Sequence, residues 1–306
     1  MRPRPSSRSG FVLLMTLVLV ILACTLLAGV ARRSSEGAME SKWSAEELQR
    51  RWAVASCQAT LLGRAEELLD EAERGQPDDR TPEKPYLNKP AAQRRVACRL
   101  AGLDYELVLT DEQAKLNANF LVQASSRGGA QSAVSQLITC AGLDASAVQL
   151  RTLVAGQNAT KDIRGLLTVG GYGQVFPDVA PDRLTGREEH AGLADWVTCW
   201  GDGHVNIRRA PAAVVQRACE KVLEPNTIRT LLAVRDRDPY RPLSAMLDDL
   251  DRVDAKEKTK IAERFTDRSK CHGLWVIARG PQRSWYELAV GVGEKQEPDT
   301  RYRFAW

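Results

Sequence analysis

Few side chains of this 306-residue chain combine the types and the spacing that catalysis needs. The histidines are His190, His204 and His272, and none lies near a serine in a nucleophile-elbow pattern. Cys271 precedes His272, but adjacency in sequence does not place a thiolate against an imidazole. The run GGYG at 170–173 lacks the lysine and the hydroxyl residue of a phosphate-binding loop. We therefore expect that the protein is not an enzyme.

A cluster of carboxylates near residue 250 has the chemistry of a calcium site. Its members are Asp248, Asp249, Asp251 and Asp254. Their spacing does not match an EF-hand loop, and the solvated face of a helix explains such a cluster more simply. We expect no cofactor, with calcium at these aspartates as the alternative.

The seven cysteines are spread along the chain, at positions 24, 57, 98, 140, 199, 219 and 271. No two of them form a C-x-x-C pair, so zinc or thioredoxin-like chemistry has little support. The cysteines that follow Cys24 would permit up to three disulfides in an oxidising compartment, in several possible pairings. The alternative is that several are buried thiols that act as small apolar side chains.

The formal net charge of +4 does not indicate a surface that binds polyanions. Arg2, Arg4 and Arg8 belong to the first ten residues, and beyond them 40 basic residues stand against 39 acidic ones. A nucleic-acid-binding domain usually has a marked excess of lysine and arginine. The composition, with 43% hydrophobic and 27% charged residues, is that of a mostly soluble folded body.

The segment from Phe11 to Ala31 carries no charged residue, and as a helix it would be about 31 Å long, enough to cross a bilayer. Three interpretations compete. A secretory signal would be cleaved after Ala31, although its apolar core would be unusually long. A lipoprotein signal would be cleaved before Cys24. In the third interpretation the cut follows Gly10 on the cytoplasmic side, and the apolar helix remains as an anchor.

The next predicted element is an amphipathic helix. Ser44-Ala45-Glu46-Glu47 has the pattern of a capping box and predicts a helix start at this point. Gly75 and Pro77 predict that the helix ends near Arg74. Apolar residues recur at three- and four-residue steps and predict one buried face, formed by Trp43, Leu48, Trp52, Ala55, Ala59, Leu62 and Leu69.

Strand patterns occur in two distant parts of the chain. Residues 95–101 and 105–110 predict a hairpin, and residues 273–279, 285–290 and 302–306 predict three further strands. Helices are predicted between them, at 130–141, 145–155, 163–168, 212–223, 225–236 and 243–250, the last with Ser244 as its N-cap. We expect the hairpin and the last strands to share one sheet, in an α+β body with a large helical insertion.

Two stretches share one pattern, a short strand that ends in asparagine ahead of an apolar-periodic segment. The first runs from Asp111 to Asn119 and contains Lys115-Leu116-Asn117-Ala118-Asn119, and the second runs from Trp200 to Pro211 and contains Asp202-Gly203-His204-Val205-Asn206. An asparagine oxygen can accept hydrogen bonds from the first turn of a helix, and proline is tolerated in that turn. Asn117, Asn119 and Asn206 are therefore predicted as structural caps.

The N-terminal segment resembles a known class of signal. Arg8-Ser9-Gly10-Phe11 is similar to the class III signal of type IV pilins and pseudopilins. In that family a prepilin peptidase cuts after the glycine, and the new N-terminal residue, here Phe11, is methylated. Most members carry glutamate at the fifth mature position, which is Met15 in this chain. The minor pseudopilin called type II secretion system protein K lacks that glutamate.

The two asparagine stretches resemble the same protein K family. Its members carry a G-K-L-N-x-N type strand and, later, a D-G-K-V-N-I-N-T-A-P type strand. In this chain Ala114 replaces the first glycine, His204 replaces the lysine, and Arg208 replaces the last asparagine. Because that asparagine is lost, Asn206 or a backbone turn must supply the cap of the second helix.

The resemblance implies a pilin-like α+β fold. An N-terminal helix would pack on a small antiparallel sheet, with an inserted all-α region of two SAM-like lobes. It divides the chain into a prepilin leader (1–10), a transmembrane segment (11–31), a stalk helix with the first strands (32–119), a first lobe (120–194), a second lobe (195–270) and the C-terminal strands (271–306).

The resemblance also implies a function. The chain would be a non-enzymatic minor pseudopilin at the tip of the type II secretion pseudopilus, which exports folded proteins across the outer membrane. It would cross the inner membrane once, with its body in the periplasm. Its partners would be other minor pseudopilins, the major pseudopilin and the prepilin peptidase. The family is also known for calcium sites.

An alternative function follows from a second resemblance. The run 195–270 is similar to a helix-hairpin-helix module, which would make the chain a membrane-anchored envelope protein that binds DNA. Phosphate binding in such modules needs a glycine-rich hairpin that offers backbone N–H groups. This chain has the residues CEKVLEP at 219–225 instead, so we expect no nucleic acid as a partner.

The leader makes a direct prediction. A side chain at residue 10 would obstruct a peptidase that cuts after it, so we expect Gly10→Val to retain the leader while the protein still inserts. Mass spectrometry of the wild-type protein should find a mature N-terminus at Phe11. The same spectrum should show the added mass of an N-methyl group on this residue. A mature N-terminus after Ala31 or at Cys24 would contradict the pseudopilin interpretation.

In Met15→Glu, pairing with a neighbouring amine should become possible.

Overall fold

The structure is a computed structural model, and its description rests on part of the chain. It describes residues 8–74, 90–100, 103–118, 121, 127–140, 179–186, 191–220, 222–251, 253–279, 284–293 and 301–305. These residues belong to two compact units, residues 1–53 and residues 54–306. The domain boundaries expected from the sequence stay predictions.

The first unit consists of most of one helix, α1 (Arg8–Leu61). By length and composition this helix can cross a membrane, and the side chains from Phe11 to Ala31 are all exposed. The hydroxyls of Thr16 and Thr25 donate to backbone oxygens three residues earlier in the helix. These hydrogen bonds satisfy the hydroxyl groups internally, as an apolar solvent would require.

The predicted helix start at Ser44 is wrong, because α1 runs through it without a break. The residues before Ser44 are already helical, so the backbone N–H groups that a capping box would satisfy have carbonyl partners one turn earlier. Glu47 contacts Arg50 at 2.8 Å and Arg51 at 2.7 Å. The hydrogen bond from Arg50 is the main reason why the pKa of Glu47 falls to about 2.

In the second unit, the end of α1 continues through a 3-10 turn, η1 (Leu62–Arg64), into α2 (Ala65–Arg74). The helical segment ends at Arg74, as predicted. Its buried side chains recur every three or four residues, at Val54, Gln58, Leu62, Ala65, Leu69 and Glu73. This row packs on the sheet, since α2 contacts the first two sheet strands and η1 contacts the two that follow in the sheet.

The predicted apolar face of this helix is therefore only partly correct. Leu62 and Leu69 are buried, but Trp43, Leu48 and Trp52 are more than half exposed. Ala59 is exposed and Ala55 is half-buried. The buried row includes the polar Gln58 and Glu73, so a pattern drawn from apolar residues alone did not find the buried face before Leu62.

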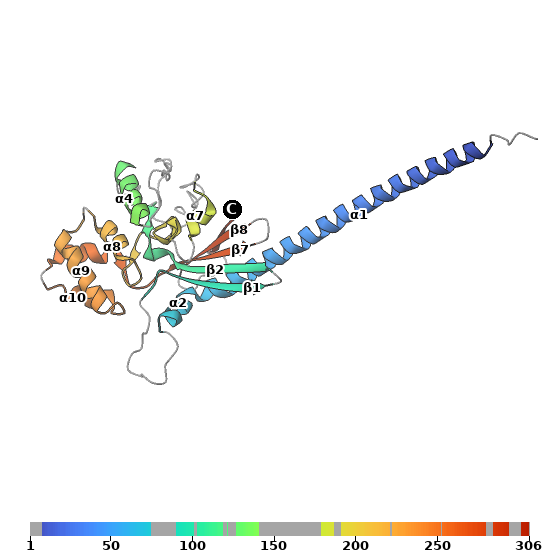
Figure 1. The fold of residues 1–306 in the computed structure, drawn as a ribbon. Coiled ribbons are helices and arrows are strands. Elements are labelled where there is room, and N and C mark those ends of the chain that lie inside the picture. Colours follow the sequence, from blue (N-terminus) through green and yellow to red (C-terminus); the bar gives the residue numbers. More distant parts are fainter. Residues whose placement is uncertain are drawn as a thin grey trace, which may run out of the picture. The chain divides into compact units, whose positions relative to one another are not determined.

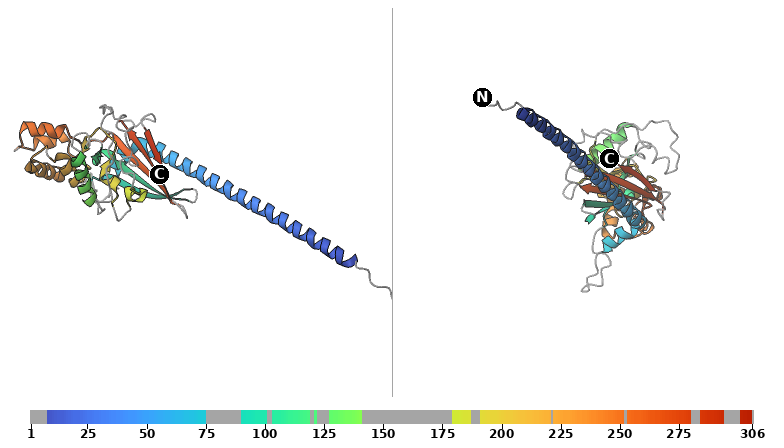
Figure 2. Two further views of the ribbon diagram at one scale, coloured as in Figure 1. Left: turned by 90° about the horizontal axis from the view of Figure 1, so that it is seen from above. Right: turned by 90° about the vertical axis from the view of Figure 1, so that its right-hand side faces the viewer.

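One five-stranded antiparallel sheet forms the centre of the second unit (Figure 1). Its strands, in spatial order, are β1 (Gln93–Leu100), β2 (Leu103–Asp111), β7 (Cys271–Arg279), β8 (Ser284–Val292) and β9 (Arg301–Ala305). β2 pairs directly with β7, with Val108 opposite Trp275. The hairpin and the C-terminal strands lie side by side in Figure 2, which confirms the prediction of a shared sheet.

The described residues between β2 and β7 form a mostly helical insertion. Its described elements are η2 (Glu112–Ala114), β3 (Leu116–Asn117), α4 (Arg127–Cys140), α7 (Pro181–Thr185), η4 (Leu193–Asp195), β4 (Val197–Thr198), β5 (Val205–Asn206), α8 (Ala212–Cys219), α9 (Pro225–Arg237), α10 (Leu243–Asp248), α11 (Ala255–Ala262) and β6 (Phe265–Thr266). Two short parallel pairs, β3 with β4 and β5 with β6, join distant parts of the insertion.

Several of the predicted helices are present, and others differ. The helices predicted at 145–155 and 163–168 lie outside the described residues. α10 begins at Leu243 after Pro242, so Ser244 is not its N-cap, and the N–H of Leu243 instead donates to Asp267 at 2.9 Å. α11 was not predicted. Its N-cap is Asp254, whose carboxylate accepts from the N–H of Glu257.

The core of the second unit lies between the sheet and the insertion. Val108, Trp275 and Leu288 come from the sheet and pack with Trp200 and the helices of the insertion in one cluster of buried residues. Eight of the nine residues of β7 are buried, because this strand is covered on both faces. The architecture is α+β, as predicted, and it brings the start and the end of the insertion together at the ends of β2 and β7.

Candidate functional site

The two asparagine stretches, far apart in sequence, are tied to each other in the structure. The side-chain amide of Asn117 donates to the carbonyl of Trp200 at 2.9 Å. Gln113 donates to the carboxylate of Asp202 at 2.7 Å. Asn206 donates to the carboxylate of Asp111, also at 2.7 Å. These hydrogen bonds close the insertion at its base. We call the buried polar residues at this point the junction, and they form the candidate site.

The predicted caps have different outcomes, because Asn206 does not cap α8, whereas the caps predicted for Asn117 and Asn119 stay predictions. α8 begins after Pro211 and has no side-chain cap. The oxygen of Asn206 accepts from the N–H of Arg208 at 3.1 Å and so stabilises a turn. Asn117 and Asn206 are buried, and a buried amide must satisfy its donors as well as its acceptor. Asn119 lies outside the described residues.

Asp111, at the end of β2, is fully buried at the centre of the junction. Its Oδ1 accepts from the backbone N–H groups of Gln113 and Ala114, at 2.9 and 3.1 Å, which caps η2. Its Oδ2 accepts from Asn206 and lies 3.4 Å from the Nη1 of Arg209. One carboxylate thus holds the end of the sheet, the start of the insertion and the second asparagine stretch.

Arg209 provides the positive charge of the junction, and its side chain is fully buried. Its Nε donates to Glu73 at 2.7 Å. Its Nη1 donates to Glu66 at 2.5 Å and its Nη2 to Asp70 at 2.7 Å. These three acidic residues lie at i, i+4 and i+7 of α2, which places them on one face of the helix. Burial by itself would lower the pKa of Arg209, but Asp111 and the acidic residues of α2 raise it above its ordinary value.

Arg208 strengthens the same contact from the neighbouring position. Its guanidinium contacts Glu73 and lies 2.7 Å from Asp70. It also lies 4.8 Å from the centre of the Tyr240 ring, within cation–π distance. This position, where the resemblance expects asparagine, therefore serves to bind α2. Sequence reasoning assigned no role in a site to either arginine or to the acidic residues of α2.

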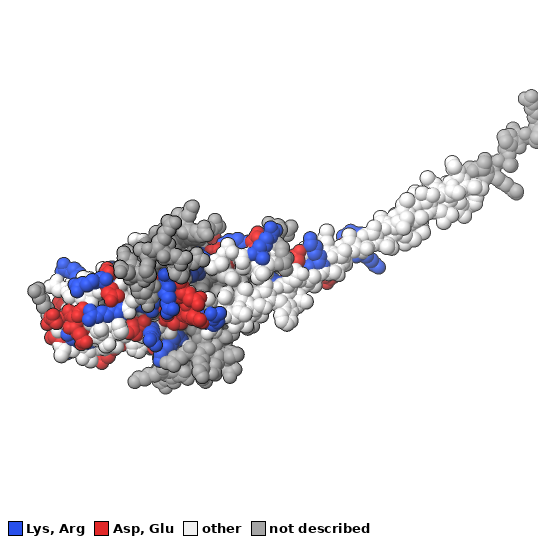
Figure 3. Space-filling model, turned by 90° about the horizontal axis from the view of Figure 1, so that it is seen from below, with Lys and Arg blue, Asp and Glu red and all other residues white. Residues whose placement is uncertain are grey.

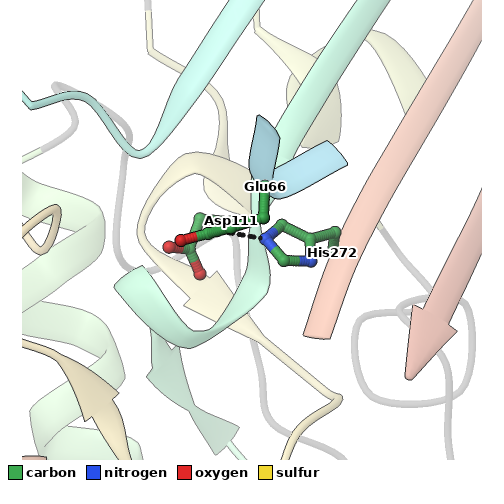
Figure 4. A group of neighbouring side chains, drawn as sticks. All are labelled: Glu66, Asp111 and His272. Atoms are coloured by element: carbon green, nitrogen blue, oxygen red, sulfur yellow. Dashed lines mark hydrogen bonds and ion pairs between the residues drawn. The ribbon is translucent and has the colours of Figure 1, made fainter. Parts of the chain in front are cut away.

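Three side chains of the junction have the composition of a small metal site. Glu66, Asp111 and His272 bring their ligand atoms within 4.8 Å of one another (Figure 4). Carboxylates and an imidazole suit a divalent cation. However, Nη1 of Arg209 contacts the same oxygens of Glu66 and Asp111, so a guanidinium charge already stands beside them. The geometry favours an internal ion network over a metal centre.

His272 is used within this network. Its Nε2 lies 2.9 Å from the Oε2 of Glu66, and the residue is buried. Cys271 is its neighbour in a strand, where successive side chains point to opposite faces. Burial raises the pKa of the Cys271 thiol, which makes a thiolate unfavourable. The adjacent cysteine and histidine therefore do not form a nucleophile with its base.

A second buried ion pair lies next to the junction. The Nζ of Lys115 donates to Glu112 at 2.6 Å, and neither side chain is exposed. Thr110 and Thr198 donate to the same carboxylate, at 2.6 and 2.5 Å. A Cβ on Gly273 would lie 2.6 Å from the Oε1 of Glu112, so glycine makes room for this group. The Lys115–Glu112 pair thus joins the end of β2 to β4, and it requires a residue without a side chain at position 273 of β7.

The remaining predicted site residues lie elsewhere. Among the four aspartates, Asp249 contacts Arg241, Asp254 caps α11, and Asp248 and Asp251 are exposed. The one metal-like group found in the described part of the chain does not include them. Calcium at these positions stays a prediction.

The residues of the predicted leader cleavage lie in or next to α1. Gly10 is part of α1, and Phe11 and Met15 are exposed at 66% and 52%. Cleavage after Gly10 and methylation of Phe11 stay predictions. His204 is near the junction, and its Nδ1 lies 3.1 Å from Asp202. That pairing raises the pKa of His204.

Comparisons with known proteins give a likeness to solved structures. No family model matches the chain, and no curated protein matches it. Among solved structures, it resembles a chain in the crystal structure of the GspK-GspI-GspJ complex from the enterotoxigenic Escherichia coli Type 2 Secretion System. The alignment has 15% sequence identity and a TM-score of 0.46, and it covers 87% of this chain and 98% of that chain. A likeness at this level carries no conclusion about function.

The ion pairs of Glu66 in the junction predict that the folded state becomes less stable in acid. Burial raises the pKa of Glu66, but His272 and Arg209 outweigh that effect and lower it from 4.5 to about 2. A lowered pKa in the folded state means that this group stabilises the fold above about pH 4.5 and loses that contribution as the pH falls toward 2. Since the side chain is partly solvated, we expect a contribution of about 1–3 kcal/mol.

Denaturant unfolding of the full chain at pH 7 and pH 3 measures this contribution. Glu66→Gln should be less stable than wild type at pH 7, and the difference should shrink at pH 3. Glu71→Gln is the matched control, because Glu71 is exposed on the same helix. A Glu66→Gln effect that is equally large at both pH values would contradict the assignment.

Proposed function

We propose that this chain is a minor pseudopilin of the protein K type. It would be a non-enzymatic subunit at the tip of a type II secretion pseudopilus, taking part in the export of folded proteins across the outer membrane. The observation that supports this most is the continuity of α1. The charge-free segment Phe11–Ala31 and the start of the helical row that packs on the sheet belong to one helix. A leader cut at Gly10 would keep that helix whole, whereas a cut after Ala31 would divide it.

Met15 supports a tip position. In the family that the leader resembles, the glutamate at this position pairs with the amine of a neighbouring subunit. A methionine cannot form that ion pair, and its apolar side chain suits the interior of a bilayer. The proposed location follows from the same features. The chain would cross the inner membrane once, after cleavage by the prepilin peptidase and methylation at Phe11, with its body in the periplasm.

The exposed aromatic residues of α1 support binding to partner subunits. Trp43 and Trp52 are exposed at 66% and 67%, and they lie beyond the charge-free segment, where lipid tails would not cover them. Large apolar side chains left exposed in this way commonly mark interaction sites. We propose that other minor pseudopilins cover these tryptophans. The major pseudopilin would form the part of the pseudopilus below this tip complex.

The proposal that the chain is not an enzyme rests on how its polar groups are used. Glu66 contacts both His272 and Arg209, and Asp111 lies 3.4 Å from Nη1 of Arg209. The thiols of Cys199 and Cys271 have raised pKa values because they are buried. Groups that could act on a substrate are thus committed to internal contacts in the described part of the body.

DNA binding by the second helical lobe has less support. At the connection between α8 and α9, the carboxylate of Glu257 accepts from the N–H of Glu224 at 3.1 Å and from the hydroxyl of Thr227 at 2.6 Å. An acidic group thus stands where a helix-hairpin-helix module would offer N–H groups to phosphate. Figure 3 shows acidic and basic side chains interspersed on the face that it presents. We do not propose nucleic acid as a partner.

Co-purification from detergent-solubilised membranes tests the proposed function. The full chain, expressed with its own set of pseudopilins, should bring down the other minor pseudopilins. Replacing Trp43 and Trp52 by alanine should reduce that recovery several-fold, because the apolar contact area is lost. Lys42→Ala is the control, since Lys42 is exposed beside Trp43. Recovery of the chain without any pseudopilin, or salt-dependent DNA binding at nanomolar concentration, would contradict the proposal.

A further inference from the structure

β1 lies at the edge of the five-stranded sheet, and no strand pairs with its outer side in the described part of the chain. Residues 91–95 are half-buried, but the strand then becomes open, with Val96, Ala97, Arg99 and Leu100 exposed. These residues all belong to the second unit. An exposed edge strand can accept a further strand from another chain, because its outward backbone groups are ready to form hydrogen bonds.

The hydrogen bonds between β1 and β2 show which backbone groups of β1 point outward. The N–H of Asp111 donates to the carbonyl of Ala92 at 2.8 Å, which continues the β1–β2 register by one step. Hydrogen-bonded and non-bonded residues alternate along an antiparallel pair. The even-numbered residues of β1 therefore direct their N–H and C=O groups toward β2. The odd-numbered residues direct theirs to the open side, and of these Ala97 and Arg99 are exposed.

One face of this open edge is apolar. Val96 and Leu100 are exposed at 57% and 40%. Their register partners on β2, Leu107 and Leu103, are half-buried and lie on the same face. Cys98, between the two exposed side chains, is half-buried. Every second side chain of an added strand would meet this apolar surface.

The other face of the open edge carries basic side chains. Arg95 is mostly buried and is paired with Glu106 at 2.8 Å. The side chain of Arg99 is 73% exposed, and the carboxylate of Asp104, which lies 3.5 Å away, is exposed as well. An exposed pair of this kind contributes little to stability. Arg99 can therefore form a second ion pair, with an acidic side chain on its open side.

We propose that the open edge of β1 binds an extended segment of another protein in which apolar and acidic side chains alternate. The backbone of that segment would pair with the outward N–H and C=O groups of Ala97 and Arg99. Its apolar side chains would cover Val96 and Leu100, and an acidic side chain would lie beside Arg99. The inference goes beyond the proposed function, in which the partner subunits bind α1, and it does not rest on that function.

A second copy of this chain fits the same edge less well. β1 contains Arg94, Arg95 and Arg99 and no acidic residue. In two paired copies of β1 the arginines of both strands would lie close together, and like charges on neighbouring strands destabilise a sheet. Charged side chains on an edge strand commonly oppose pairing between copies in this way. The same charges favour an acidic partner.

The test uses the full chain in lipid nanodiscs and a fluorescent synthetic peptide in which valine and glutamate alternate. At pH 7 the glutamates of this peptide repel one another, which opposes its self-pairing. We expect saturable binding by fluorescence anisotropy, and several-fold weaker binding of a peptide with lysine in place of glutamate. Hydrogen exchange followed by mass spectrometry should slow in β1 when the glutamate peptide is added, because outward N–H groups become bonded.

Two variants make this test specific to the edge. Ala97→Pro removes an outward N–H, a change that an edge strand tolerates, so the variant should unfold at nearly the wild-type temperature and no longer bind the peptide. Arg99→Glu should instead prefer the lysine peptide. This reversal of preference keeps the proposal testable if the proline variant fails to fold.

Several results would overturn the proposal. One is the absence of binding of the glutamate peptide to the wild type, and another is equal binding of the two peptides. A folded Ala97→Pro variant that binds as the wild type does would also contradict it. Exchange in β1 that slows only as the concentration of the chain itself rises would assign the edge to a second copy.

Discussion

The fold of the body depends on the buried guanidinium of Arg209. A charged group inside a protein is costly unless it is paired and hydrogen-bonded, and removing its partners leaves that cost exposed. Here Glu66, Asp70 and Glu73 come from α2, and Asp111 comes from the end of β2. The arginine itself belongs to the insertion. One side chain therefore requires the helix, the sheet and the insertion to be in place together.

This constraint explains how a large insertion can fit between two paired strands. β2 and β7 are neighbours in the sheet, so the insertion must leave and return at the same end of the sheet. The Asp111–Asn206 and Asn117–Trp200 hydrogen bonds close that point. A closed base of this kind holds the helical insertion in a fixed position on the sheet.

The sequence was informative where the signal is local. Strand alternation at 95–110 and 273–290 predicted the sheet, and Gly75 with Pro77 predicted the helix end at Arg74. Ser44 misled because a cap has no role inside a continuing helix. The asparagine stretches were identified, but their bonding partners lie in distant segments that no local pattern connects. The acidic residues of α2 had a spacing of one helix face, but their partner Arg209 could be found only from the folded chain.

The most direct test of this account is the free energy of unfolding of Arg209→Met in the full chain. Methionine fills similar space but leaves the buried carboxylate of Asp111 without its counter-charge and leaves Glu73 with Arg208 alone, so we predict a loss of about 3–5 kcal/mol. Arg64→Met, which removes an exposed pair with Glu67, should leave the unfolding free energy unchanged. If Arg209→Met unfolds at the same denaturant concentration as the wild type, the junction does not hold the fold together.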